Sequence, residues 1–199
     1  VALDHDFEGD LRPADQGLDL GADERRSCWA RIARETDDGT VHIGPFASPQ
    51  LAIDASQPKD EIQVTVGECR GVHTYEGASS FLQTVHITHN VSLVGGYLRD
   101  FSEHKSLNPN SEFETVFNAQ SNGRALLIDN TTAVTVSDIL LTGGHAVAGG
   151  GANAWGGGLY APTGERLTLS RVYFEGNAAT DGGGLSVEGE RLSLANVRM

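Results

Sequence analysis

The chain has 199 residues, of which 25 are glycine and only 7% are aromatic, and its formal net charge is −13 with an isoelectric point near 4.8. This charge excludes nucleic acid as a partner, because its phosphates would be repelled, and it disfavours polyanionic substrates unless a cation bridges the charges. No stretch approaches the roughly 18 consecutive apolar residues of a membrane-spanning helix, so we expect no membrane insertion within this sequence.

Residues 1–27 form an acidic segment that we expect to be irregular. Its carboxylates recur at the positions that supply oxygen ligands in a calcium-binding loop, and Gly9 stands where such a loop turns sharply. The pattern suggests a structural calcium ion as the only cofactor, although Pro13 interrupts the helix that should follow. The alternative is a solvated acidic turn in which Arg12 forms a local salt bridge. The candidate ligands are Asp4, Asp6, Glu8 and Asp15.

The two cysteines, Cys28 and Cys69, lie far apart in the sequence and belong to no metal-binding or redox motif. We therefore predict a disulfide between them, with two unrelated buried thiols as the alternative. Such a bond would stabilise the fold by roughly 4 kcal/mol in the chain-entropy model. Disulfides persist in oxidising compartments, so the prediction favours a secreted or cell-surface protein.

Short runs in which apolar residues alternate with Ser or Thr predict strands through the rest of the chain, and no 3.6-residue stripe predicts a helix. Segments 134–146, 167–179 and 192–199 align with one another, and segments 62–68 and 91–97 are weaker versions of the same unit. The apolar positions that coincide are Val134, Val136 and Ile139; Leu167, Leu169 and Val172; and Leu192, Leu194 and Val197.

A unit of about 25 residues with short strands cannot bury its inner face alone, so it must stack on a neighbouring unit, as in a solenoid. Parallel stacking would place equivalent side chains about 4.8 Å apart, in internal aliphatic ladders. The sequence therefore predicts an all-β, parallel β-helical fold. The predicted ladder pairs are Leu159 with Leu185, Leu167 with Leu192, and Leu169 with Leu194.

Two glycine triplets, at residues 156–158 and 182–184, precede corresponding leucines of the repeat. We expect them to form turns that need a positive φ or a close approach of the backbone in each successive unit. A phosphate-binding loop is the functional alternative, but no Lys followed by Ser or Thr comes next and no helix is predicted there.

The stretch FEGNAATDGGGL, residues 174–185, resembles the paired FxxN and GGxL motifs of polymorphic outer-membrane protein repeats. The aligned earlier unit has Leu141 and Gly144 in place of the first motif. The resemblance implies a right-handed parallel β-helix on a bacterial surface. More broadly, residues 28–199 resemble the long secreted β-helix proteins of environmental bacteria. The matching residues, which would form a ladder at the turns, are Phe174 and Asn177, followed by Gly183, Gly184 and Leu185.

Residues 3–24 resemble the segment that closes the C-terminal end of such β-helices, although here they stand at the start. We therefore divide the chain into residues 1–27, a closing or linking element, and residues 28–199, a β-helix that is open at its C-terminal end. Either the sequence spans the junction of two tandem β-helical domains, or the closing segment acts on another molecule.

No catalytic residue is predicted. His86 and His89 have a spacing that places them on opposite faces of a strand, which disfavours a shared metal ion. His145 lacks the neighbouring paired aspartates of β-helical pectinases. Asp138, Arg171 and Asn196 occupy equivalent outward positions, and we interpret them as a solvated row.

An open β-helix exposes unpaired strand edges, so further coils of the same polypeptide or another copy of the chain should cover the C-terminal end. We expect an extracellular structural or adhesive protein, assembled head to tail into a surface filament in which residues 1–24 add strands to the next copy. The alternative is a polysaccharide lyase or glycoside hydrolase acting in a side groove. Loops 71–83 and 98–122 are where surface glycans would bind, with Tyr75, Tyr97, Phe101 and Trp155 nearby.

Overall fold

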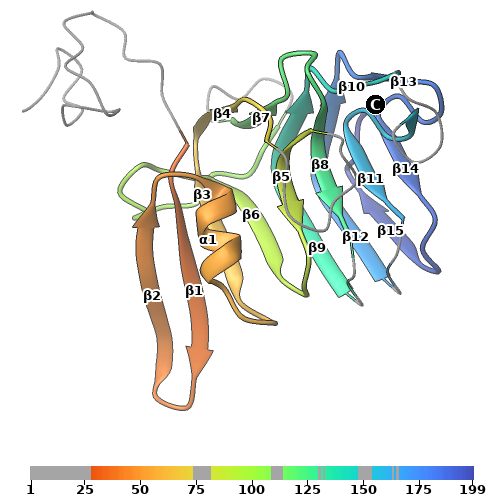
Figure 1. The fold of residues 1–199 in the computed structure, drawn as a ribbon. Coiled ribbons are helices and arrows are strands. Elements are labelled where there is room, and N and C mark those ends of the chain that lie inside the picture. The colour runs from red at the N-terminus through yellow and green to blue at the C-terminus, as the bar shows by residue number, and fades with distance from the viewer. Residues whose placement is uncertain are drawn as a thin grey trace, which may run out of the picture.

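Strands dominate the computed structural model, which describes residues 28–73, 82–108, 114–129, 131, 133–147, 154–162, 164 and 166–199. The acidic segment 1–27 therefore lies outside the described residues. The strands form a nine-stranded, a four-stranded and a two-stranded sheet (Figure 1). Among the described residues, no helix has the length and apolar character needed to cross a membrane.

The nine-stranded sheet runs in the order β15-β12-β9-β6-β3-β1-β2, and β7 joins it by pairing with both β4 and β9. All of its pairings are parallel except those of β1 with β2 and with β3. Its strands are β1 (Ala30–Thr36), β2 (Gly39–Phe46), β3 (Glu61–Thr65), β4 (Gly67–Arg70), β6 (Ser92–Tyr97), β7 (Thr115–Asn118), β9 (Ala133–Thr142), β12 (Arg166–Glu175) and β15 (Leu192–Ala195).

The four-stranded sheet has the order β14-β11-β8-β5 and is parallel throughout. From β5 onwards the chain passes repeatedly from this sheet to the nine-stranded sheet and back, so neighbouring strands come from successive passages. The remaining strands are β5 (Gln83–Ile87), β8 (Arg124–Ile128), β11 (Leu159–Ala161) and β14 (Leu185–Val187), together with the two-stranded pair β10 (His145–Ala146) and β13 (Ala178–Ala179).

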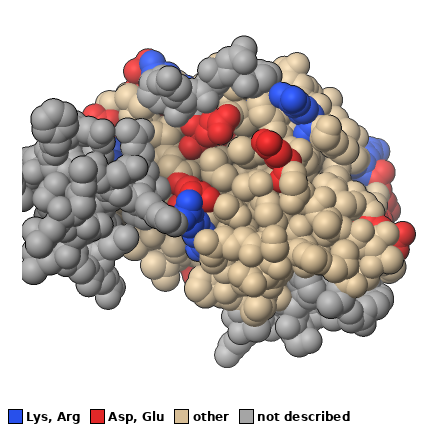
Figure 2. Space-filling view, turned by 90° about the horizontal axis from the view of Figure 1, so that it is seen from above, with Lys and Arg blue, Asp and Glu red and all other residues tan. Residues whose placement is uncertain are grey.

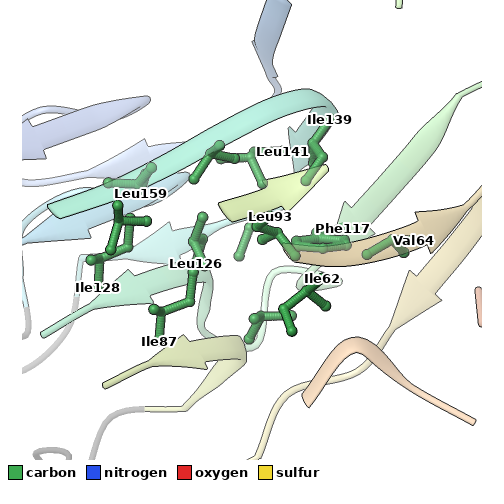
Figure 3. Packing of buried hydrophobic residues seen from close by; sticks show 14 of the residues in the cluster. Ile62, Val64, Ile87, Leu93, Phe117, Leu126, Ile128, Ile139, Leu141 and Leu159 are labelled. Carbon is green, nitrogen blue, oxygen red and sulfur yellow. The ribbon is translucent and has the colours of Figure 1, made fainter. Parts of the chain in front are cut away.

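The hydrophobic core lies between the inner faces of the two larger sheets. Alternate residues of each strand point inward, and Figure 3 shows side chains such as Leu126 and Leu159 directed toward Leu93 and Leu141. All four of these leucines are fully buried. Burying one such side chain contributes about 1.5–3 kcal/mol, which gives every passage of the chain a share in the stability.

A short helix closes the core beside β1, β3 and β5, which corrects the prediction that the chain has no helix. Helix α1 (Pro49–Ala55) begins after Ser48, whose hydroxyl accepts a hydrogen bond from the Leu51 amide at 3.3 Å. Seven residues are too few to show a 3.6-residue stripe, so only the Ser-Pro start could have signalled the helix. Ala52 and Ile53 are buried against the core.

The side chain of Gln50 in α1 occupies the free edge of β5. Its amide oxygen accepts a hydrogen bond from the backbone N–H of His86 at 2.7 Å, and its amide nitrogen donates to the backbone oxygen of His86 at 3.1 Å. These are the bonds that a neighbouring strand would make. The helix therefore prevents another strand from pairing with this end of the four-stranded sheet.

The antiparallel hairpin of β1 and β2 is a second departure from the expected parallel arrangement of residues 28–199. Thr36 pairs with Gly39, so only Asp37 and Asp38 form the turn. Gly39 has a φ of +115°, a conformation that favours glycine. An Asp-Gly pair between two alternating segments is the local signal for such a hairpin.

The opposite end of the nine-stranded sheet is exposed in the described structure. In β15, the side chains of Leu192 and Leu194 are 42% and 47% exposed. The residues stacked beneath them in β12, Leu167 and Leu169, are 5% and 0% exposed. The two ends of the stack therefore differ, because α1 covers one and apolar side chains line the other.

Candidate functional site

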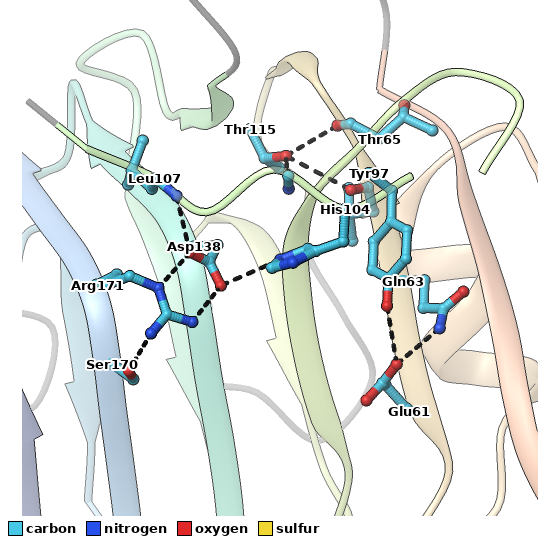
Figure 4. A network of polar contacts seen from close by, with 12 residues as sticks. Glu61, Gln63, Thr65, Tyr97, His104, Leu107, Thr115, Asp138, Ser170 and Arg171 are labelled. Carbon is cyan, nitrogen blue, oxygen red and sulfur yellow. Dashed lines mark hydrogen bonds and ion pairs between the residues drawn. The ribbon is translucent and has the colours of Figure 1, made fainter. Parts of the chain in front are cut away.

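Residues 98–108, which follow β6, lie against the outer face of the nine-stranded sheet and bring His104 to it (Figure 4). The Lys105 amide donates to the Gly96 oxygen at 2.7 Å, and the Leu98 amide donates to the Glu103 oxygen at 2.9 Å. The rings of Tyr97 and His104 are 5.1 Å apart. This segment belongs to loop 98–122, which the sequence singled out as a source of functional groups.

His104 reaches Asp138, which lies in the middle of β9 and is fully buried. One carboxylate oxygen of Asp138 accepts hydrogen bonds from the Leu107 amide at 2.8 Å and from Arg171 Nε at 2.6 Å. The other oxygen accepts one from Arg171 Nη2 at 2.8 Å and lies 3.3 Å from His104 Nε2 (Figure 4). Asp138 thus connects a loop and two adjacent strands.

The interpretation of Asp138, Arg171 and Asn196 as a solvated row is wrong for Asp138, which has no exposed surface. All three residues adopt a positive φ, of 58°, 53° and 54°, so the strand direction changes at the same point in each passage. Asn and Asp are the non-glycine residues that best tolerate this conformation. Their presence at equivalent positions was the signal that could have revealed the bend.

The arrangement at Asp138 is suited to holding structure in place. Both carboxylate oxygens are already engaged, and the group cannot be reached from solvent. A catalytic acid or base must come within hydrogen-bond reach of a substrate. The geometry instead makes Asp138 a positioning residue that fixes Arg171 and the segment carrying His104.

A second polar cluster lies on the same face, over β1, β3 and β6. Arg31 Nε donates to the side-chain oxygen of Gln63 at 2.6 Å, and Gln63 donates in turn to Glu61 at 2.7 Å. The hydroxyl of Tyr97 also donates to Glu61, at 3.3 Å (Figure 4). The Arg31 guanidinium lies 4.6 Å from the centre of the Phe101 ring. Burial, together with the charge and hydrogen bond of Glu61, raises the pKa of Tyr97 to about 12.

The predicted disulfide between Cys28 and Cys69 is confirmed. It joins residues 41 apart in the sequence, with their Cα atoms 5.2 Å apart, and ties the start of β1 to β4. The bond borders a cavity of about 160 Å³ that is also lined by the first residues of α1 and by His73. Glu68 and Arg70, which form an ion pair with each other, also line it.

The leucines of the predicted ladders occupy equivalent positions in neighbouring strands. Leu159 pairs in register with Leu185, Leu167 with Leu192, and Leu169 with Leu194. The row continues on the other side of β11 and β12. There Leu159 pairs with Leu126, and Leu167 and Leu169 pair with Val134 and Val136.

The residues of the FxxN and GGxL motifs run from the end of β12 to the start of β14. Phe174 is buried, and the side chain of Asn177 reaches back to the preceding passage of the chain. Its oxygen accepts a bond from the Gly144 amide, and its nitrogen donates to the Leu141 oxygen, each at 2.8 Å. Behind them, Gly183 and Gly184 lead into β14. A Cβ at Gly158 would come within 2.5 Å of the Gly184 oxygen, so the close stacking of these turns requires glycine.

The other predicted residues are dispersed. His86 lies in β5 and His89 in the turn after it, where its Nε2 is 2.8 Å from the Ser56 hydroxyl oxygen. Trp155 donates to Asp181 at 3.2 Å, away from Tyr97 and Phe101. The described residues contain no group of three or more His, Cys, Asp or Glu side chains placed to hold a metal ion. The calcium candidates Asp4, Asp6, Glu8 and Asp15, and also Tyr75, lie outside the described residues.

No protein-family model, curated protein or solved structure matches the chain.

Proposed function

We propose that this chain is a right-handed parallel β-helix with an extracellular structural or adhesive role. The in-register rows of like side chains support the β-helix, because each passage of the chain covers the apolar face of the one before it. The Cys28–Cys69 disulfide supports an oxidising, extracellular location.

The exposed edge of β15 is the observation that carries the structural role. Leu192 and Leu194 are half exposed on a strand that has β12 on one side and solvent on the other in the described structure. Such an edge is a template for another strand. Under this proposal, residues 1–24 of a second copy pair with it, and repetition of this contact builds a filament. The exposed Arg191 and Arg198 beside β15 complement the acidic character of that segment.

Electron microscopy and sedimentation of the purified full chain test this proposal. We expect fibres from the native chain and loss of fibres in Leu194→Asp, because a carboxylate on the open edge opposes strand addition. Leu51→Asp is the matched control, since Leu51 is similarly exposed at 52% but lies on α1. A native chain that stays monomeric at all concentrations would refute assembly, as would equal effects of the two substitutions.

One observation favours the alternative of a carbohydrate-active enzyme. Acidic side chains gather on the face seen from above, which lies over β4 and β7 (Figure 2). Burial and the charge of Glu175 raise the pKa of Glu114. Two interacting carboxylates, one of them protonated more readily, are what a glycoside hydrolase uses. This alternative predicts release of reducing sugars from a polysaccharide by the native chain and none by Glu114→Gln.

A further inference from the structure

A continuous row of polar side chains, four of them Ser or Thr, crosses the outer face of the nine-stranded sheet. The register pairs Glu61 with Ser92, Ser92 with Thr135, Thr135 with Thr168, and Thr168 with Ser193. We call these five residues the outer row. With strands about 4.8 Å apart, the row is about 19 Å long. The inward neighbours of these residues are core side chains, so alternation along each strand directs the outer row away from the core.

A parallel row two residues further along the strands contains Ser137 and Ser170. Ser137 is only 8% exposed, and its hydroxyl, which is not sealed from solvent, makes no hydrogen bond within the described part of the chain. A hydroxyl with unused bonding capacity beside the outer row is therefore available to a ligand that lies on this face.

One end of the outer row is closed by a series of hydrogen bonds that runs from Arg31 through Gln63 to Glu61. Arg31 is fixed by Gln63 and by the Phe101 oxygen, which accepts from its Nη2 at 3.3 Å, while its Nη1 makes no hydrogen bond among the described residues. The bonds to Glu61 use Oε1, so its Oε2 is likewise unused in the described structure. The face therefore presents a fixed donor and a fixed acceptor next to the rings of Tyr97 and Phe101.

We propose that the outer row, with the Arg31–Glu61 cluster at its end, binds an uncharged polysaccharide chain lying across the strands. Each sugar hydroxyl both donates and accepts, which matches a donor and an acceptor held side by side, and the apolar faces of sugar rings suit aromatic contacts. The strand spacing is close to the length of one sugar unit in an extended chain, so successive strands meet successive units. The net charge of −13 disfavours acidic glycans.

This ligand assignment rests on the adhesive role proposed above, and it is tested separately by calorimetry. The disulfide-intact full chain is titrated with cellohexaose, laminarihexaose and mannohexaose, and with oligogalacturonate as an acidic comparison. We expect binding of at least one uncharged oligosaccharide. Thr135→Val and Thr168→Val, which keep the side-chain shape, should each weaken it about fivefold, as expected for one lost hydrogen bond. Thr142→Val is the matched control, because Thr142 is also half-buried on β9 but lies outside the outer row. The affinity of this variant for the oligosaccharide should stay within about twofold of that of the native chain.

The proposed polysaccharide site would be overturned if the folded chain bound none of the uncharged oligosaccharides. Fibres in the same preparation would still support the structural role. Equal affinities of the outer-row and control variants would overturn it as well, because the ligand would then bind elsewhere. Tighter binding of oligogalacturonate would contradict the charge argument. If a preparation without fibres still binds the oligosaccharide, the result would support the outer row as the binding site and would contradict only the proposed assembly into a filament.

Discussion

Replacing Arg171 by glutamine should destabilise the chain more than replacing its partner Asp138 by asparagine. Arg171 makes two hydrogen bonds to Asp138, at 2.6 and 2.8 Å, and Asp138 is fully buried. In Arg171→Gln, the buried carboxylate keeps only the Leu107 amide and His104. In Asp138→Asn, no charge remains in the interior, and asparagine tolerates the φ of +58° at this position.

The burial of the two side chains sets the size of each effect. Removing one partner of a buried ion pair costs about 3–5 kcal/mol. The side chain of Arg171 is 33% exposed, so water offsets part of this loss and we expect about 2–3 kcal/mol for Arg171→Gln. For Asp138→Asn we expect about 1 kcal/mol, because Arg171 can turn toward water. The double variant should lose less than the sum of the two.

Urea unfolding followed by circular dichroism measures these differences. Arg166→Gln serves as the control, because Arg166 is exposed on the same strand and should change the free energy of unfolding by less than about 0.5 kcal/mol. The reasoning would be refuted if Asp138→Asn were as costly as Arg171→Gln, or if the two effects simply added. Either result would show that Asp138 is not a buried charge that depends on Arg171.

Three further predictions concern the covalent link, the open end and the acid limb of stability. Cys28→Ser should lower the free energy of unfolding by roughly 4 kcal/mol, and a chemical denaturation midpoint unchanged from the native chain would contradict this. Leu169→Ala should lower the free energy of unfolding by about 2–5 kcal/mol, because Leu169 is fully buried. Leu194 is 47% exposed, so Leu194→Ala should lower it much less in a dilute monomer. Equal losses of stability would mean that β15 is covered. Burial of Asp60 opposes its ionisation, but its hydrogen bonds to Arg34 and the Gln57 amide outweigh burial and lower its pKa from 3.8. The stability that ionised Asp60 contributes is therefore complete above pH 3.8 and is lost as the pH falls further. Asp60→Asn should remove this part of the acid dependence, and an unchanged pH profile of thermal unfolding would argue against the ion pair.

The sequence allowed prediction of the parts of the fold that repeat. Leucine and valine at matching positions revealed which strands stack, because the inner face must be filled by similar side chains in each passage. The disulfide could be predicted because Cys28 and Cys69 are the only cysteines. The FxxN motif directed attention to Asn177, whose side chain bridges two passages.

The features that do not repeat escaped prediction. Helix α1 is too short for periodicity, and its start depends on the single cap of Ser48. The burial of Asp138 depends on His104 and Leu107, which come from a loop whose path no sequence pattern indicates. The clustering of Arg31 with Phe101 joins residues 70 positions apart and follows only from the sheet order.

Paired cysteines on the outer face test the stacked arrangement most directly. Thr135 and Thr168 are register partners on β9 and β12, whereas Ser170 lies two residues beyond Thr168. With the native disulfide intact, the double variant Thr135→Cys, Thr168→Cys should be bridged rapidly by dibromobimane, a reagent that becomes fluorescent when it links two nearby thiols. The offset pair Thr135→Cys, Ser170→Cys should react far more slowly. Equal bridging of the two pairs, or faster bridging of the offset pair, would contradict the in-register stacking on which the fold and both proposals depend.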